Sequence, residues 1–167
     1  MIEALLRDLR QPEYVHTLLN PLPIYGLAIA LLALVIALLV RSRSGQVTAL
    51  VLILVCAASV WPVVAFGERA YDNILTSSDD DGRAWLEAHE ERAERLMYVF
   101  YALAACAAAA ILVPRKWPKA ATPLAVATLM LAIASLGAGA SIAYAGGKIR
   151  HREFRTVPPP EKAPPRS

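Results

Sequence analysis

Three histidines are the residues of this 167-residue chain best suited to bind a metal ion or a cofactor. His16 precedes the first of four long apolar segments, His89 precedes the third and His151 follows the fourth. If all four segments cross a membrane as helices, the three histidines lie on the same side. At 1.5 Å per helical residue, each stands on the order of 10 Å beyond the hydrocarbon. The topology therefore predicts that three chain segments bring imidazoles to a similar height.

His89 is the most informative of the three because helical spacing places it with Leu86, Ala93 and Leu96 instead of the neighbouring glutamates. A buried imidazole needs a partner, which can be a metal ion, a carboxylate or a backbone carbonyl. One hypothesis is an interfacial site for copper, zinc or haem iron formed by His16 and His89, with or without His151. The alternative is that His89 forms a hydrogen bond across the bundle while the other two lie in solvent. The four segments contain no histidine, so any haem would lie near the membrane surface.

The composition identifies the lipid bilayer as the expected surroundings. Hydrophobic residues make up 57% of the chain, against about 45–50% in soluble domains, and they are concentrated in the four nearly uncharged segments. The formal net charge is +3, but the lysines and arginines are scattered among acids and form no basic helix face. We therefore expect no nucleic-acid partner.

The predicted fold is all-α: an integral membrane four-helix bundle with short cytoplasmic hairpin loops. An N-terminal arm, residues 1–20, precedes a transmembrane domain at 21–147, and a basic, Pro-rich flexible tail occupies 148–167. The spans are predicted at about 21–40, 47–66, 96–113 and 120–145.

Local signals refine these predictions. Pro62 near the far end of the second span predicts a kink. The acidic run Asp79–Asp81 supplies N-cap candidates for a helical extension at about 83–95, which we expect to continue into the third span. In the fourth span, Ser135 with Gly139 and Gly137 with Ser141 place small residues four apart. We expect this surface to pack inside the bundle, the alternative being a homo-oligomer contact.

The two short loops, 41–46 and 114–119, carry five Lys or Arg and no acid, which predicts that they are cytoplasmic. The termini are then extracytoplasmic. The count of all basic residues favours the opposite orientation, because the other twelve Lys and Arg lie on the far side. We favour the first orientation because the charge of the short loops is dense and adjoins the spans.

Three segments resemble a family of small bacterial four-span membrane proteins of unknown function, which opens with a pattern similar to HPLLVHFPIGL. HTLLNPLPIYGL at His16 resembles that opening, LEAHEERAERL contains the counterpart of the family histidine before the third span, and YAGGKIRHREF resembles the segment after the fourth. The resemblance covers roughly residues 16–154. The chain departs from the pattern where a second opening histidine is replaced near Pro21 and where Thr17 stands in place of a common proline. The resemblance implies the four-span architecture and singles out His16 and His89, but it implies no activity.

No nucleophile, base and orienting residue occur at a recognisable spacing, so we expect no enzymatic activity. The expected function is that of a small accessory or redox-associated subunit of the bacterial inner membrane with a histidine-lined extracytoplasmic site. The alternative is a structural or assembly subunit that packs against a larger membrane complex without a cofactor.

Overall fold

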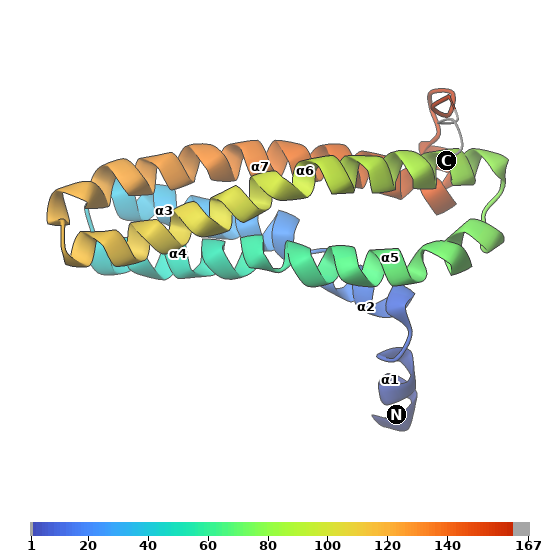
Figure 1. Cartoon of the computed structure of the whole chain (residues 1–167), viewed down its shortest axis with the longest axis horizontal. Helices are drawn as coiled ribbons and strands as arrows, with labels where there is room; N and C mark the ends of the chain where they lie inside the picture. The colour runs from blue at the N-terminus through green and yellow to red at the C-terminus, as the bar shows by residue number, and fades with distance from the viewer. Residues whose placement is uncertain (1, 162–167) are drawn as a thin grey trace.

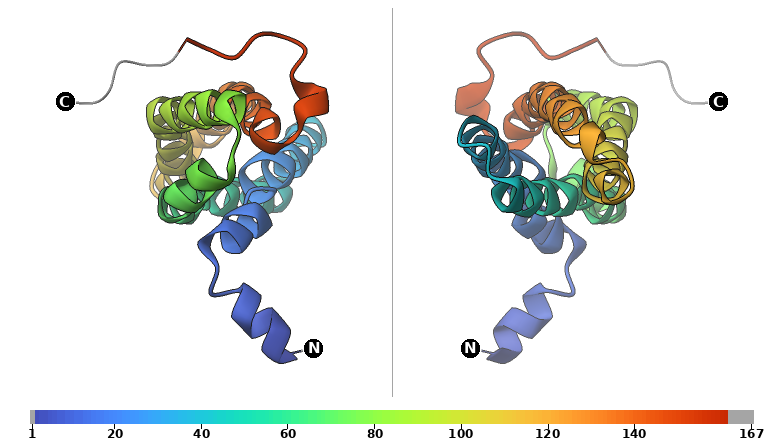
Figure 2. Two further views of the ribbon diagram at one scale, coloured as in Figure 1. Left: turned by 90° about the vertical axis from the view of Figure 1, so that its right-hand side faces the viewer. Right: turned by 90° about the vertical axis from the view of Figure 1, so that its left-hand side faces the viewer.

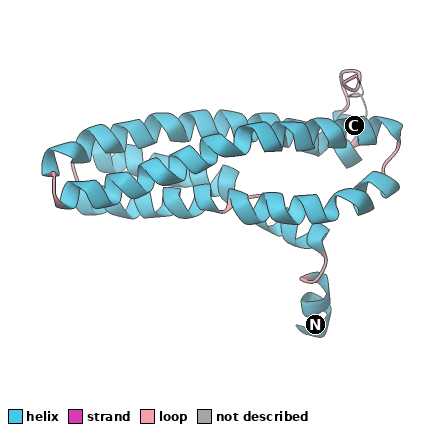
Figure 3. Ribbon diagram, in the orientation of Figure 1, coloured by secondary structure: helices cyan, strands magenta, loops and turns pink. Residues whose placement is uncertain are grey.

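The computed structural model describes residues 2–161, which form helices joined by short turns, with no strand among them (Figures 1 and 3). Four helical rods are long and apolar enough to cross a membrane, spanning Pro12–Leu39, Arg43–Ser77, Asp80–Arg115 and Pro118–Arg150. The prediction of an all-α, four-span bundle is thus confirmed. The end of the predicted tail, residues 162–167, lies outside the described residues.

The first rod combines α2 (Pro12–Leu19), a π-helical turn (Leu22–Gly26) and α3 (Leu27–Leu39). The second combines α4 (Arg43–Ala58) and α5 (Val60–Ser77). The third is α6 (Asp80–Leu112) with a 3-10 turn (Val113–Arg115), and the fourth is a 3-10 turn (Pro118–Ala120) with α7 (Ala121–Arg150). A short helix, α1 (Ile2–Asp8), precedes the rods, and a 3-10 turn (Arg152–Phe154) follows them.

The predicted N-terminal arm contains two helices that the sequence did not reveal. α1 extends away from the bundle and runs across its long axis (Figure 1). α2 instead packs along α5, although its eight residues are too few to form a stable helix in isolation. Tertiary packing therefore determines the conformation around His16.

The second rod is interrupted at Ser59, between α4 and α5. Pro62 is four residues beyond Ala58, the last residue of α4. A proline has no N–H for the carbonyl four residues before it, and its ring collides with that carbonyl. The rod is thus interrupted three residues before Pro62, next to the Ala58 carbonyl, while the kink itself stays a prediction.

α6 is continuous from the predicted extension into the third span, as expected. Asp79 is its N-cap, and its Oδ1 accepts a hydrogen bond of 3.0 Å from the backbone N–H of Gly82. α7 runs to Arg150, five residues beyond the predicted end of the fourth span at Ala145. The predicted start of the tail at 148 is therefore wrong, because α7 stays packed along α6 and buries Lys148.

The core lies where the four rods meet. A view along the bundle axis shows the rods arranged around it (Figure 2). Small side chains in the core let the helices approach closely, which is how membrane helices gain contact area. The fully buried larger residues are Leu27, Leu34, Leu50, Ile53, Phe100 and Leu103. They lie beside buried alanines of every rod.

The small residues of the fourth span divide between two faces. Ser135 and Gly139 are buried, and a Cβ on Gly139 would lie 3.3 Å from Ile24 and 3.5 Å from Phe100. Gly137 is exposed, with no other atoms within 4 Å of such a Cβ. Packing inside the bundle accounts for the first pair. Cys56 and Cys106 are both free thiols, and Cys56 is a buried packing residue.

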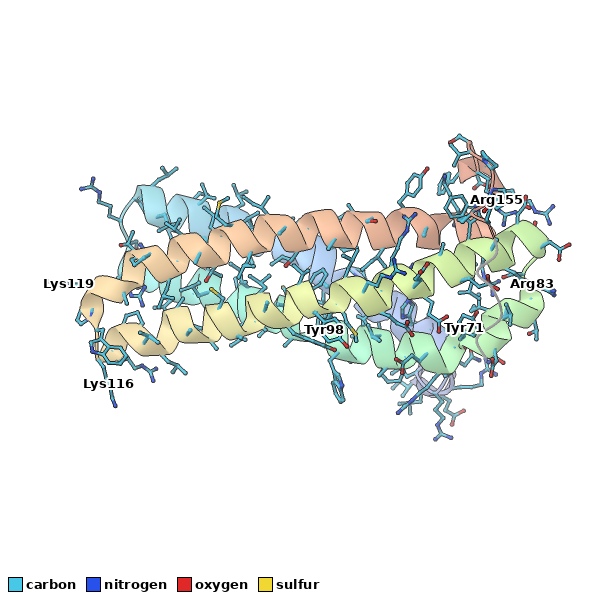
Figure 4. All side chains as sticks on the ribbon, turned by 45° about the horizontal axis from the view of Figure 1, so that its top comes forward. Tyr71, Arg83, Tyr98, Lys116, Lys119 and Arg155 are labelled. Atoms are coloured by element: carbon cyan, nitrogen blue, oxygen red, sulfur yellow. The ribbon has the colours of Figure 1, made fainter. Side chains whose placement is uncertain are left out.

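The two ends of the bundle differ in what they carry. The short connections after α3 and after α6 lie together at one end, while both termini and the α5–α6 turn lie at the other (Figure 1). Lys116 and Lys119 mark the first end and Arg83 and Arg155 the second (Figure 4). The predicted grouping of loops is thus confirmed, and the histidines belong to the end that carries the termini.

Candidate histidine-pair site

His16 joins α2 to α5. Its Nδ1 lies 2.8 Å from the carbonyl oxygen of Val63. The ring rests on Gly67, where a Cβ would come within 3.0 Å of Nδ1 and Cε1. Glycine is therefore required here to let the imidazole approach the α5 backbone.

His89 joins α6 to α7 by the same kind of contact. Its Nδ1 lies 3.0 Å from the carbonyl oxygen of Ile142. The ring rests on Gly146, where a Cβ would come within 2.9 Å of Nδ1. Each accepting carbonyl belongs to the residue four before the glycine, so the two histidines use equivalent geometry on different helices.

This geometry defines the state of the rings. A backbone carbonyl only accepts, so Nδ1 of each neutral imidazole carries the proton and Nε2 presents a lone pair. This tautomer is assigned from the hydrogen bonds. Both rings are half-buried. Each histidine is thus held in the form that binds metals through Nε2.

The two rings meet between the α2–α5 pair and the α6–α7 pair. Their centroids are 6.3 Å apart and their planes are 86° apart. With a metal–nitrogen distance of ~2.0–2.1 Å, two imidazoles on opposite sides of one ion have ring centres roughly 6 Å apart. The centroid distance of His16 and His89 is close to this value.

His151 makes its contacts elsewhere. It follows α7, is exposed, and its Nδ1 lies 2.9 Å from Oε1 of Glu153. Its ring stacks on Phe154 with centroids 4.9 Å apart. Across residues 2–161, no group of three or more His, Cys, Asp or Glu side chains is placed to hold a metal ion. The structure thus brings two of the three predicted histidines together, and the donor set is a pair of imidazoles.

A buried lysine lies in α7 two residues beyond Gly146. Lys148 is 3% exposed, and its Nζ donates a hydrogen bond of 2.6 Å to the hydroxyl of Tyr144. Nζ also lies 4.4 Å from the centre of the Trp85 ring and 3.9 Å from that of Tyr144. The aromatic faces stabilise the ammonium group. Trp85 is therefore part of the α6–α7 contact.

Sequence reasoning missed the two glycines and the lysine. An isolated glycine within a helical pattern signals close approach of another group, and Gly67 lies in such a pattern. Gly146 was interpreted as the end of the fourth span. Lys148 carried no signal, because a lysine after an apolar segment is ordinarily solvated.

No family model, no curated protein and no solved structure matches the chain.

Proposed function

We propose that this chain is a non-enzymatic subunit of the bacterial inner membrane that binds one transition-metal ion, or the iron of a haem, between His16 and His89. The observation that supports the proposal is the repeated histidine–glycine–carbonyl contact. It uses Nδ1 of both imidazoles, so Nε2 is the nitrogen through which each ring would bind a ligand.

The donor set favours copper or haem iron over zinc. Zinc sites in proteins take three or four protein ligands, whereas the proposed site has the imidazoles of His16 and His89. Imidazole suits copper and iron, and histidine is an axial ligand of haem iron. Either metal would supply one-electron chemistry, which supports a redox-associated role at the extracytoplasmic face.

Asparagine provides a discriminating substitution. In His16→Asn and His89→Asn, the side-chain amide can still donate to Val63 or Ile142, but the Nε2 lone pair is lost. We expect the purified wild type, supplied with Cu(I) or with haem, to retain close to one equivalent. The asparagine variants should stay folded and retain none, while His151→Ala should bind as the wild type does.

The readouts are elemental analysis and the optical spectrum of oxidised and reduced protein. A Soret band that both asparagine substitutions abolish assigns haem, and copper retained without such a band assigns the ion. No retention of either by the wild type, or equal retention by the variants, contradicts the proposal.

The alternative is a structural or assembly subunit without a cofactor. The hydrogen bonds and packing of His16 and His89 favour this alternative when no ligand is considered, because each Nδ1 has a partner and each ring fills the space above a glycine. A larger membrane complex could pack on the apolar groove of about 410 Å³ between α3 and α4, which Ala37, Gly45 and Ala49 help to line. In this case His16→Asn and His89→Asn should leave both the stability and the cofactor content unchanged.

A further inference from the structure

A second cavity lies at the opposite end of the bundle from the histidines, beside the turn between α3 and α4. Its volume is about 380 Å³, and it combines two guanidinium groups, an amide and a hydroxyl with two apolar side chains. The lining residues are Leu38, Arg41, Arg43, Gln46, Ala121 and Thr122. The beginning of α7 thus faces the turn across the cavity.

Arg41 occupies a position where glycine is the usual residue. Its φ is 53°, in the left-handed region, which is unfavourable for a residue with a Cβ. The N–H of Arg41 donates to the carbonyl of Leu38 at 3.1 Å, and that of Ser42 donates to Ala37 at 3.0 Å. These two bonds are the helix-ending pattern in which glycine normally follows the cap. An arginine here gives up backbone stability, and Arg41 is one of the residues that line the cavity.

Arg43 is fixed in position by hydrogen bonds. It donates to the carbonyl of Ala110 on α6 at 3.2 Å and to Oε1 of Gln46 at 3.3 Å. Gln46 is itself only 8% exposed and lies 3.5 Å from the carbonyl of Ala37. Because both acceptors are neutral, they do not offset the positive charge of Arg43, which can attract an anion.

The sequence around the cavity complements an anion. No acid occurs in residues 41–67 or in residues 95–152, which include both short loops. The loops add Arg115, Lys116 and Lys119 to the two arginines of the cavity, and the labelled lysines lie at this end of the bundle (Figure 4). The positive charge here is therefore not neutralised within the loops.

We propose that this cavity binds the phosphate of an anionic phospholipid headgroup. Arginine pairs with phosphate through two parallel hydrogen bonds, and basic pockets between membrane helices at the cytoplasmic face bind such headgroups. The cavity lies where α3 and α4 leave the apolar region, the level of the lipid phosphates. Leu38 and Ala121 provide the apolar contact that a lipid has and free phosphate lacks. The site is independent of the histidine pair.

The test is native mass spectrometry of the full chain in detergent, titrated with dioleoyl phosphatidylglycerol or dioleoyl phosphatidylcholine. The key variant is Arg41→Gly, because glycine removes the guanidinium while relieving the left-handed backbone. It should fold at least as stably as the wild type. Its retention of phosphatidylglycerol should weaken by about fivefold or more, as should that of Arg43→Gln.

The matched controls are Arg115→Gln, a loop arginine outside the cavity lining, and Arg41→Lys, which keeps the charge. Both should retain phosphatidylglycerol better than Arg41→Gly. Equal retention of the two lipids by the wild type would overturn the proposal, as would a loss in Arg115→Gln as large as in Arg41→Gly. Displacement of phosphatidylglycerol by millimolar inorganic phosphate would assign the cavity to a soluble phosphate and overturn the lipid assignment.

Discussion

At the scale of single residues, the positions of His16 and His89 depend on the glycines against which their rings pack. Gly67 and Gly146 lie under the two imidazoles, and an added Cβ would approach ring atoms to 3.0 Å and 2.9 Å. Rings that also form hydrogen bonds to backbone carbonyls cannot move away without losing those bonds. The glycines are thus as important to the site as the histidines.

We predict that Gly67→Ala and Gly146→Ala each destabilise the protein by about 1–3 kcal/mol, the usual cost of overpacking. The control is Gly137→Ala, because Gly137 faces open space. In a helix interior, alanine there should stabilise by about 0.5–1 kcal/mol. The measurement is thermal or denaturant unfolding in one detergent. If all three substitutions change the free energy of unfolding by the same amount, Gly67 and Gly146 are not the positions against which the imidazoles pack.

The histidine site could be predicted from the sequence only in part. The apolar face shared by His89 and Leu86 predicted a buried imidazole with a partner, and one of the predicted partners, a backbone carbonyl, is the one observed. The position of His16 depends on α2, which is helical because it packs on α5. The periodicity of one segment does not show how that segment is rotated relative to another segment.

At the scale of elements, one cluster fixes the α5–α6 turn to the chain after α7. Asp79 accepts from Arg155 through both carboxylate oxygens, at 2.9 Å each, and lies 3.0 Å from Arg152. Arg155 also donates to the carbonyls of Lys148 and Ile149. Gly82 permits this arrangement, because a Cβ there would lie 2.7 Å from the Ile149 carbonyl oxygen. The residues after α7 are thereby held to the start of α6.

We predict that Asp79→Asn lowers the unfolding temperature and releases residues 152–155. Asparagine is an N-cap residue and preserves the bond to Gly82, so the loss reports on the arginine contacts alone. The control is Asp80→Asn, because the side chain of Asp80 is 89% exposed and pairs with Arg83 only at 3.9 Å. Limited proteolysis should cleave after Arg152 or Arg155 faster in Asp79→Asn. Equal cleavage in the two variants would mean that the contacts do not hold the segment.

The same cluster predicts a dependence on pH. Hydrogen bonds from Arg155 lower the pKa of Asp79 from its ordinary 3.8 to about 2. A lowered pKa means that the ionised carboxylate stabilises the folded state above about pH 4, and that this contribution disappears as the pH falls towards 2. The difference in unfolding temperature between wild type and Asp79→Asn should therefore be constant near neutral pH and shrink between about pH 4 and 2. A difference that grows on acidification would contradict the assignment.

The helical elements were largely predictable because apolar length, prolines and N-cap residues act locally. Asp79 marks a helix boundary where the structure has it, and the break at Ser59 lies three residues before Pro62. The end of α7 was predicted too early because Lys148 was expected in water. Its ammonium instead lies against Trp85 and Tyr144, and this contact joins residues that are far apart in the sequence.

At the scale of the whole molecule, the two ends carry different chemistry. One end holds the histidine pair, where the α2–α5 and α6–α7 pairs meet. The other end holds the two arginines of the cavity and both short basic loops. The proposals for the two ends thus require opposite faces of the membrane, and the orientation of the chain connects them.

We predict that the short basic loops are cytoplasmic and that the histidine end is extracytoplasmic. Dense positive charge beside the spans resists translocation, and the loops 41–46 and 114–119 carry no acid that offsets it. The experiment uses a background without Cys56 and Cys106, into which Asp80→Cys or Lys116→Cys is introduced. Both positions are exposed. Asp80 begins α6 at the end of the bundle that carries the α5–α6 turn, and Lys116 lies at the other end (Figure 4). A membrane-impermeant maleimide should label Asp80→Cys in intact spheroplasts and Lys116→Cys only after lysis. The reverse pattern would place the histidine pair in the cytoplasm and the arginine cavity in the outer leaflet of that membrane, where the cytoplasmic enrichment of anionic lipid no longer supports the phospholipid site.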